Sequence, residues 1–264
     1  MMMKFKKLFL GLATMTALFT GGCSQAKKQS EPVLTKTAAI KKAQQTFKSG
    51  QAKQLIDLST DTASQVITSS YTFGGNPTVF HLNYQTQVKD KNNNIEEWIS
   101  NTNKTYINGQ SNWYYSDLKQ MSGHSYADLL DAIMNNNLLM NPPQKLVNAY
   151  KMKRSGNTYT LTATITDPKI MREAAEPILL TNTQSQRQYP TYHKLVKAGK
   201  YKKMDVKLVI KNQKLATFNY KVNLQIGKMF QMNIGQSYAN MRSQDFLKIP
   251  NNVLTAKPLP KQKK

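Results

Sequence analysis

The last third of the chain alternates between apolar and polar residues along three long stretches. Stretches 203–211, 216–226 and 230–238 carry apolar residues at every second position except 236, with mostly Lys, Asn, Thr and Gln between them. A period of two is the period of a β-strand, whose successive side chains point to opposite faces of a sheet. Asn212-Gln213 and Gly227 separate the stretches as turns. We therefore expect an antiparallel three-strand meander with one apolar and one polar face.

Shorter alternating stretches predict further strands at 67–73, 80–88, 95–100, 104–107 and 158–165. Between the strand at 104–107 and Trp113, Asn108-Gly109 predicts a hairpin turn, because both residues tolerate positive φ.

Apolar residues at spacings of three and four predict helices at 35–49, 125–136 and 168–180. Ser125 is a suitable N-cap for the second helix, with Asp128 three residues later. Long one-sided strands need cover on their apolar face, and these helices can provide it. The expected fold is α+β, a curved antiparallel sheet covered by helices. We expect 181–200 to be a polar excursion and 251–264 a mobile tail.

The first 22 residues have the pattern of a secretory signal. Three lysines precede an apolar core at 8–19, which is too short for a comfortable membrane span, and small residues follow it. Cys23 comes next and begins a polar tether, residues 23–34. This arrangement resembles the lipobox of bacterial lipoproteins, whose cysteine receives acyl chains such as palmitate. The resemblance implies lipid anchoring at the extracytoplasmic face of the cell membrane; the alternative is ordinary signal cleavage beside an incidental cysteine.

The net charge of the chain limits the classes of molecule that it is expected to bind. The formal net charge is +23, and removal of residues 1–22 takes away three lysines and leaves +20. Nucleic acid, an anionic membrane face and an anionic polymer are the common partners of such a charge. Export argues against nucleic acid. A Gram-positive surface would offer anionic lipid and teichoic-acid phosphates, although the lysines alternatively serve only solubility.

The order of elements resembles the LolA/LppX-like group of lipoproteins and lipoprotein carriers. The shared features are a lipobox cysteine, a first helix, meandering strands, central helices and a closing three-strand meander. The ending Tyr238-Ala239-Asn240, followed by Ile249–Val253, is also similar to Gram-positive members. The resemblance implies one domain over 35–253 with a half-open β-barrel, an apolar cavity under helices and a bound lipid or acyl chain. A basic tail, 254–264, follows it.

Catalytic patterns are weak in this chain. Gly235–Ala239 approaches a nucleophile elbow, but its Ser237 falls inside an alternating strand and not at a strand-to-helix turn. Glu96 and Glu97 are adjacent on a strand, so they point to opposite faces and cannot act as a carboxylate pair. We find no phosphate-binding glycine loop and no spaced His/Cys cluster. We expect no enzyme, no metal site and no cofactor.

Two functions remain open. The first is a lipid-anchored protein that carries a lipid or acyl chain in an apolar cavity. The candidate lining residues are Phe218, Tyr220, Leu224, Phe230, Met232 and Ile234 on the strands, with Leu130, Ile133 and Met134 on the covering helix. The second is a non-enzymatic surface module that binds anionic wall polymer or a protein partner through its basic face. Periodicity alone cannot distinguish a cavity wall from a packed interior.

Overall fold

A computed structural model describes residues 33–89 and 91–260. The predicted signal segment, residues 1–22, and the predicted lipid attachment site Cys23 lie outside the described residues. The account below concerns the compact unit that begins at Leu34.

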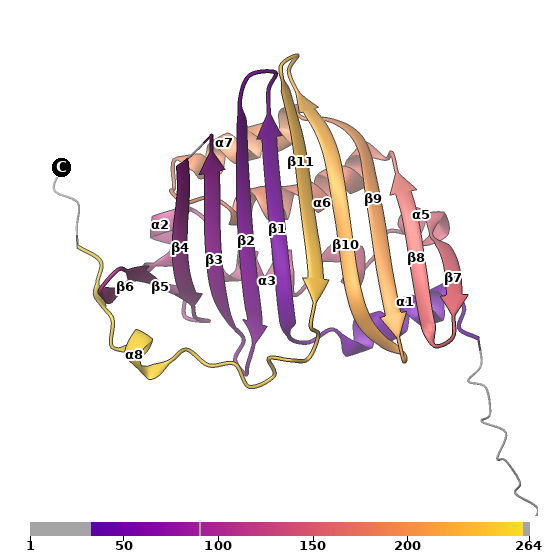
Figure 1. Ribbon diagram of the computed structural model, residues 1–264, viewed down its shortest axis with the longest axis horizontal. Helices are drawn as coiled ribbons and strands as arrows, with labels where there is room; N and C mark the ends of the chain where they lie inside the picture. The colour runs from indigo at the N-terminus through magenta and orange to yellow at the C-terminus, as the bar shows by residue number, and fades with distance from the viewer. Residues whose placement is uncertain (1–32, 90, 261–264) are drawn as a thin grey trace, which may run out of the picture. The chain divides into compact units, whose positions relative to one another are not determined.

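One sheet of twelve strands runs through this unit (Figure 1). In chain order the strands are β1 (Gly50–Ser59), β2 (Ser64–Gly74), β3 (Val79–Val88), β4 (Lys91–Ile99), β5 (Lys104–Gly109), β6 (Asn112–Asp117), β7 (Lys151–Ser155), β8 (Thr158–Ile165), β9 (Lys200–Lys211), β10 (Lys214–Ile226), β11 (Phe230–Ala239) and β12 (Lys257–Pro258). Their order across the sheet is β12-β6-β5-β4-β3-β2-β1-β11-β10-β9-β8-β7. The edge strands β12 and β7 do not pair with each other, so the curved sheet stays open.

The sheet consists of two meanders that join in its middle. Strands β1 to β6 form one, β7 to β11 form the other, and β1 pairs antiparallel with β11. We call the β1–β11 pairing the seam. Its register places Gln54 opposite Gln236 and Ile56 opposite Ile234. All strand pairs are antiparallel except that of β12 with β6.

Helices cover one face of the sheet (Figure 1). The helices are α1 (Lys36–Thr46), α2 (Leu118–Ser122), α3 (Tyr126–Ile133), α4 (Asn137–Met140), α5 (Gln144–Ala149), α6 (Pro168–Thr181), α7 (Gln188–Ala198) and α8 (Asn251–Leu254). Helices α1 and α6 contact β9 and β10, and α3 packs against α6. This arrangement confirms the predicted α+β fold with a half-open sheet under helices. None of the described helices has the length and hydropathy needed to cross a membrane.

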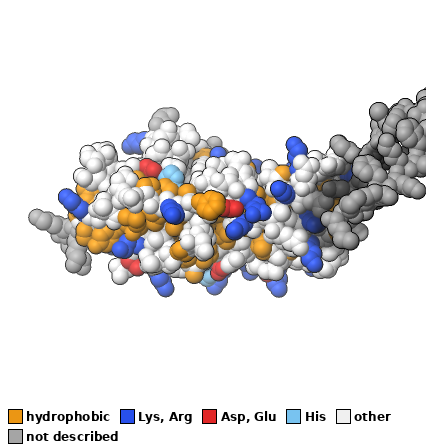
Figure 2. Space-filling model, turned by 90° about the horizontal axis from the view of Figure 1, so that it is seen from below, with side chains coloured by type: hydrophobic (Ala, Val, Ile, Leu, Met, Phe, Trp, Pro, Cys, Tyr) orange, Lys and Arg blue, Asp and Glu red, His pale blue; other side chains and the backbone are white. Residues whose placement is uncertain are grey.

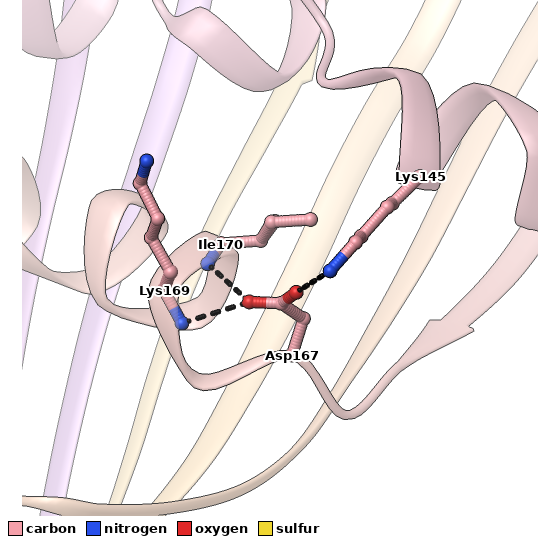
Figure 3. Close-up of polar contacts among 4 residues, drawn as sticks. All are labelled: Lys145, Asp167, Lys169 and Ile170. Carbon is pink, nitrogen blue, oxygen red and sulfur yellow. Dashed lines mark hydrogen bonds and ion pairs between the residues drawn. The ribbon is translucent and has the colours of Figure 1, made fainter.

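Local sequence signals fix where the covering helices begin. The predicted capping box of α3 is present, with Ser125 and Asp128 each accepting a backbone N–H of the other. Asp167 caps α6 (Figure 3): its Oδ1 accepts the N–H groups of Lys169 and Ile170 at 3.0 and 3.3 Å. Its other oxygen accepts the Lys145 ammonium at 2.7 Å. Asp167 therefore fixes the start of α6 and links it to α5.

The core lies between the sheet and the helices. Aromatic rings from β2, β10, β11 and the C-cap of α1 meet there: the ring of Tyr238 lies edge-on to that of Phe47 at 5.3 Å and stacks on that of Phe218 at 6.0 Å. Edge-to-face and stacked contacts of this kind stabilise a core beyond simple burial. The helix-covered face of the sheet is thus a packed interior.

The C-terminal residues 240–260, which we call the strap, were expected to end in a mobile tail from 251. The structure shows instead helix α8 and strand β12, which pairs in parallel with β6. Val253 is buried against Trp98 and Tyr106 on the side of the sheet away from the helices. For residues 251–258 the expectation was wrong, because it was based on Lys and Pro content. Val253, with Leu247, Ile249 and Ala256 packed beside it, and backbone hydrogen bonds hold the strap.

Three other elements differ from the sequence expectation. Strand β1 lies at the centre of the sheet but was not predicted, because it buries a polar residue, Gln54, and turns Leu55 outward. The stretch 181–200 contains helix α7, which buries only Val196 fully and so has a weak apolar pattern. The turn after β5 is Gln110-Ser111, since Gly109 pairs with Asn112.

Candidate functional site

The face of the sheet opposite the helices, which we call the open face, carries two rows of side chains across the seam. Strand register places Leu55, Gly235, Lys221, Asp205 and Thr164 in one row. It places Lys53, Ser237, Asn219, Lys207, Thr162 and Lys151 in the next. Rows two residues apart on the same strands point to the same face, so the lysines of both rows share one surface.

A groove of about 780 Å³ follows these rows. It is lined by Lys53, Leu55, Ala149, Lys151, Thr162, Ala163, Thr164, Asp205, Val206, Lys207, Asn219, Tyr220, Lys221, Gly235, Gln236 and Ser237. Gly235 lies between Leu55 and Lys221 and adds no side chain, and an added Cβ would stand 3.2 Å from the carbonyl oxygen of Tyr220. A glycine inside a strand often marks a place where another molecule approaches the backbone.

The groove is strongly basic. Lys53, Lys151, Lys207 and Lys221 are exposed along it, against one acid, Asp205. Asp205 is already engaged: Lys203 Nζ lies 2.9 Å from its Oδ2, and the Thr164 hydroxyl donates to its Oδ1 at 2.8 Å. The bond from Lys203, more than any other contact, lowers the pKa of Asp205. Among the described residues, the four groove lysines have no acidic side chain within 4.0 Å.

The residues predicted to bind a lipid lie on the other, helix-covered face. Those that are buried in the core are Phe218, Tyr220, Leu224, Met232, Ile234 and Ile133, and those half-buried against it are Leu130 and Met134. Phe230 is 42% exposed, because it follows the tight β10–β11 turn at the sheet's end. The structure thus brings eight of the nine together in a filled interior and leaves Phe230 apart from them. Lipid binding by these residues stays a prediction.

A buried polar row crosses this interior. Gln236 donates to the carbonyl of Ala132 at 3.0 Å, and the Tyr238 hydroxyl donates to that of Ile133 at 2.9 Å. Both carbonyls belong to the last turn of α3, where no partner exists within the helix. Asn182 ends α6 and donates to Gln54 Oε1 at 2.7 Å. The strands of the seam therefore hold the ends of two covering helices.

One buried carboxyl group has few partners. Glu97 is 2% exposed on the helix-covered side of β4, and within the described parts of the chain its Oε2 accepts only the Thr105 hydroxyl, at 3.2 Å. Its Oε1 and the buried Tyr71 hydroxyl lack any hydrogen-bond partner among the described residues. Burial raises the pKa of Glu97 to about 7. Its neighbour Glu96 is half-buried on the open face and bonds His81 at 2.9 Å, which confirms that the two carboxylates point apart.

The groove has the chemistry of a binding surface. Ser237 lies inside β11, as the sequence predicted, and not at a strand-to-helix turn. The groove's described lining includes no histidine, cysteine or glutamate. No group of three or more potential metal ligands occurs among the described residues. The available groups are ammonium, hydroxyl and amide groups over a partly apolar floor.

The sequence interpretation concentrated on the apolar side of the strands and did not single out the groove lysines. Alternation does place Lys207 and Lys221 on the polar face of their strands. It cannot show that Lys53, far away in the sequence, joins them, because that depends on the pairing of the unpredicted strand β1. The one local signal was Gly235 in the middle of a strand.

Comparison with known proteins gives a family and a set of distant structures, including the three below. A family described as "Family of unknown function (DUF6612)" matches residues 26–258. No curated protein matches the chain. A LolA superfamily protein from Nitrosomonas europaea aligns at 9% identity over 84% of this chain and 98% of its own, with a TM-score of 0.26. A beta-barrel-like DUF1849 protein from Brucella abortus aligns at 8% over 74% and 100%, with a TM-score of 0.21. A DUF1329 protein from Desulfovibrio piger aligns at 7% over 79% and 92%, with a TM-score of 0.20. Likenesses this weak carry no argument about function.

Proposed function

The chain belongs to the DUF6612 family, a family of unknown function, and for this member we propose a non-enzymatic role at the cell surface, the binding of an anionic polymer in the lysine groove. The observation that carries the proposal is the convergence of Lys53, Lys151, Lys207 and Lys221 along one groove. Charged clefts with low-dielectric walls concentrate ligands of opposite charge.

The dimensions of the groove favour a polymer over a single small anion. Lys53 on β1 and Lys151 on β7 are five strands apart in the sheet order. At about 4.8 Å per strand, the row is roughly 24 Å wide. A chain with several phosphates can contact all four lysines at once, whereas an isolated phosphate contacts one or two. Hydroxyl and amide groups of Thr162 and Asn219 are available to the uncharged parts of such a chain.

The predicted lipid anchor would place the polymer-binding groove at the cell membrane. We propose that Cys23 attaches the protein to the extracytoplasmic face of the cell membrane, where the phosphates of wall polymers are within reach. In this role the protein needs no cofactor and no metal ion.

Titration calorimetry with phosphodiester polymers of defined length tests the proposal. We expect a phosphoglycerol oligomer of twelve units to bind at least tenfold more tightly than one of three units, because the longer chain contacts more lysines. We expect affinity to fall at least tenfold between 50 and 300 mM NaCl, since exposed charges are screened by salt. A neutral dextran of equal length is the control. Equal binding of dextran, or no binding of either polymer, would contradict the proposal.

A second function, binding of a lipid or acyl chain between sheet and helices, is favoured by one observation. The ends of α3 and α6 are held to the sheet by hydrogen bonds of the buried polar row. Water can replace such hydrogen bonds if the helices move away from the sheet, which would open space for an acyl chain. Native mass spectrometry of the purified protein tests it. We expect a reproducible lipid adduct that is lost when Ile133, the buried last residue of α3, becomes Asp in a variant that keeps its circular dichroism. A clean mass together with no binding of a fluorescent fatty acid would exclude this function.

A further inference from the structure

One end of the sheet carries an exposed phenylalanine among basic side chains. Phe246 is 91% exposed, the most exposed large apolar side chain of the described residues. Arg242 and Lys248 are exposed on the same segment, and Lys211 and Lys214 are exposed at the β9–β10 turn. Seen from below, this end shows lysine and arginine side chains around hydrophobic ones (Figure 2).

Phe246 is exposed although hydrogen bonds hold the backbone of its segment in place. Gly75 N–H and Leu247 N–H both donate to the carbonyl of Gln244, at 3.2 and 3.1 Å. Ser49 donates to Asp245, the one acid on this segment, at 2.5 Å. Gly74 lets the two chains approach, since a Cβ there would stand 2.0 Å from the Gln244 carbonyl oxygen. The backbone around Phe246 is therefore fixed while its ring stays outside the core.

This end is also where the described chain begins. Leu34 donates its N–H to the hydroxyl of Tyr159, near the start of β8. Register places the start of β8 beside the end of β9, and the end of β11 beside the start of β1. All these termini, with the Phe246 segment, lie at the lower end of the sheet in Figure 1. We call it the tether end, because the tether leads from Leu34 back to Cys23.

We infer that the tether end docks on an anionic lipid bilayer, with Phe246 inserted at the interface and the surrounding Lys and Arg side chains against the headgroups. The inference rests on the proposed lipid anchor at Cys23, since a tether from Leu34 to that residue would reach at most about 35–40 Å when fully extended. The opposite end of the sheet lies roughly 40 Å further away, the length of the thirteen-residue strand β10. An aromatic ring flanked by basic side chains is the pattern that binds anionic membrane surfaces.

This inference does not depend on the groove. The groove lies on the open face, across β7 to β1, whereas the docking surface is the edge at the lower end of the strands. With the tether end docked, the strands would stand roughly perpendicular to the membrane. The open face would then stay accessible to a polymer.

Quenching of tryptophan fluorescence by brominated lipids tests the inference on the full chain. The variant Phe246→Trp is mixed with vesicles of brominated phosphatidylcholine and phosphatidylglycerol, and its quenching is compared with that of the wild type, which carries Trp98 and Trp113. We expect at least twofold more quenching for the variant, and less of it when phosphatidylglycerol is omitted or salt is raised. The matched control is Phe230→Trp, an exposed ring at the opposite end of the sheet, which we expect to match the wild type. Quenching at position 230 alone, or at neither position, would overturn the inference.

Discussion

Exchange of Lys207 and Lys221 for glutamate is expected to weaken binding of a phosphodiester polymer by about 100-fold. The two side chains lie on neighbouring strands of the groove, and each exchange replaces an attraction by a repulsion. Single exposed ion pairs contribute up to about 1 kcal/mol. At about 0.7 kcal/mol each, within that range, two attractions lost and two repulsions gained amount to about 2.8 kcal/mol, which is 100-fold in Kd. Titration calorimetry at 50 mM NaCl measures this change.

A matched pair of exchanges separates the groove from the net charge of the protein. Lys211 and Lys214 lie on the same two strands, β9 and β10, but at the hairpin outside the groove. Their exchange for glutamate changes the net charge by the same amount, and we expect Kd to change less than threefold. If both double variants lose affinity equally, the polymer responds to overall charge and the groove is not its site.

Exchange of Glu97 for glutamine is expected to stabilise the protein by about 3 kcal/mol at pH 8 and by less than about 1 kcal/mol at pH 5. Glu97 is buried, with one oxygen that has no partner in the described structure, and ionisation there places a charge in a low-dielectric interior. Glutamine keeps an acceptor for the Thr105 hydroxyl and carries no charge. Urea unfolding at several pH values measures the difference.

The direction of this pH effect follows from the raised pKa of Glu97. Its carboxyl group has a pKa of about 7 in the folded protein against 4.5 for an unperturbed group. Between these values the folded state keeps its proton while the unfolded state loses it, so wild-type stability falls as pH rises from about 4.5 to 7. Above pH 7 the loss is complete. The Gln variant should lack this decline.

The neighbouring Glu96→Gln variant is the control of opposite sign. Glu96 accepts a hydrogen bond from Asn108 and contacts His81 on the open face, and the Asn108 bond above all lowers its pKa. Its contribution to stability is therefore present at neutral pH and is lost as pH falls below about 4.5. We expect Glu96→Gln to destabilise slightly at pH 7. An unchanged pH profile for Glu97→Gln would mean that water or a rearrangement solvates the carboxylate.

The sequence predicted those parts of the fold in which each strand or helix buries one clear apolar face. Strands β9, β10 and β11 were predicted with their turns at Asn212-Gln213 and Gly227, where positive φ angles occur. Strand β1 escaped prediction because its alternation contains the buried Gln54, whose partners Asn182 and Gln236 are far away in the sequence. Tertiary contacts decide such a strand, and a local pattern cannot contain them.

The candidate groove was harder to predict than the fold for a related reason. Each groove lysine looks like an ordinary solvated residue on the polar side of its own strand. Their proximity results from the order and register of six strands, above all from the pairing of β1 with β11. The net charge of +23 predicted a basic surface. Only the order of the strands in the sheet shows where four of the lysines come together.

The seam also has a consequence for how the chain reaches its native state. Gln54 and Gln236, which face each other across it, are separated by 182 residues. Pairings of such long range form slowly, because a large loop must close before any contact compensates for its entropy. Each meander can assemble from its own neighbouring strands, but the seam requires nearly the whole chain. Because the groove lies across that seam, we expect it to form last in folding. A bound polymer would then stabilise the pairing of the two meanders.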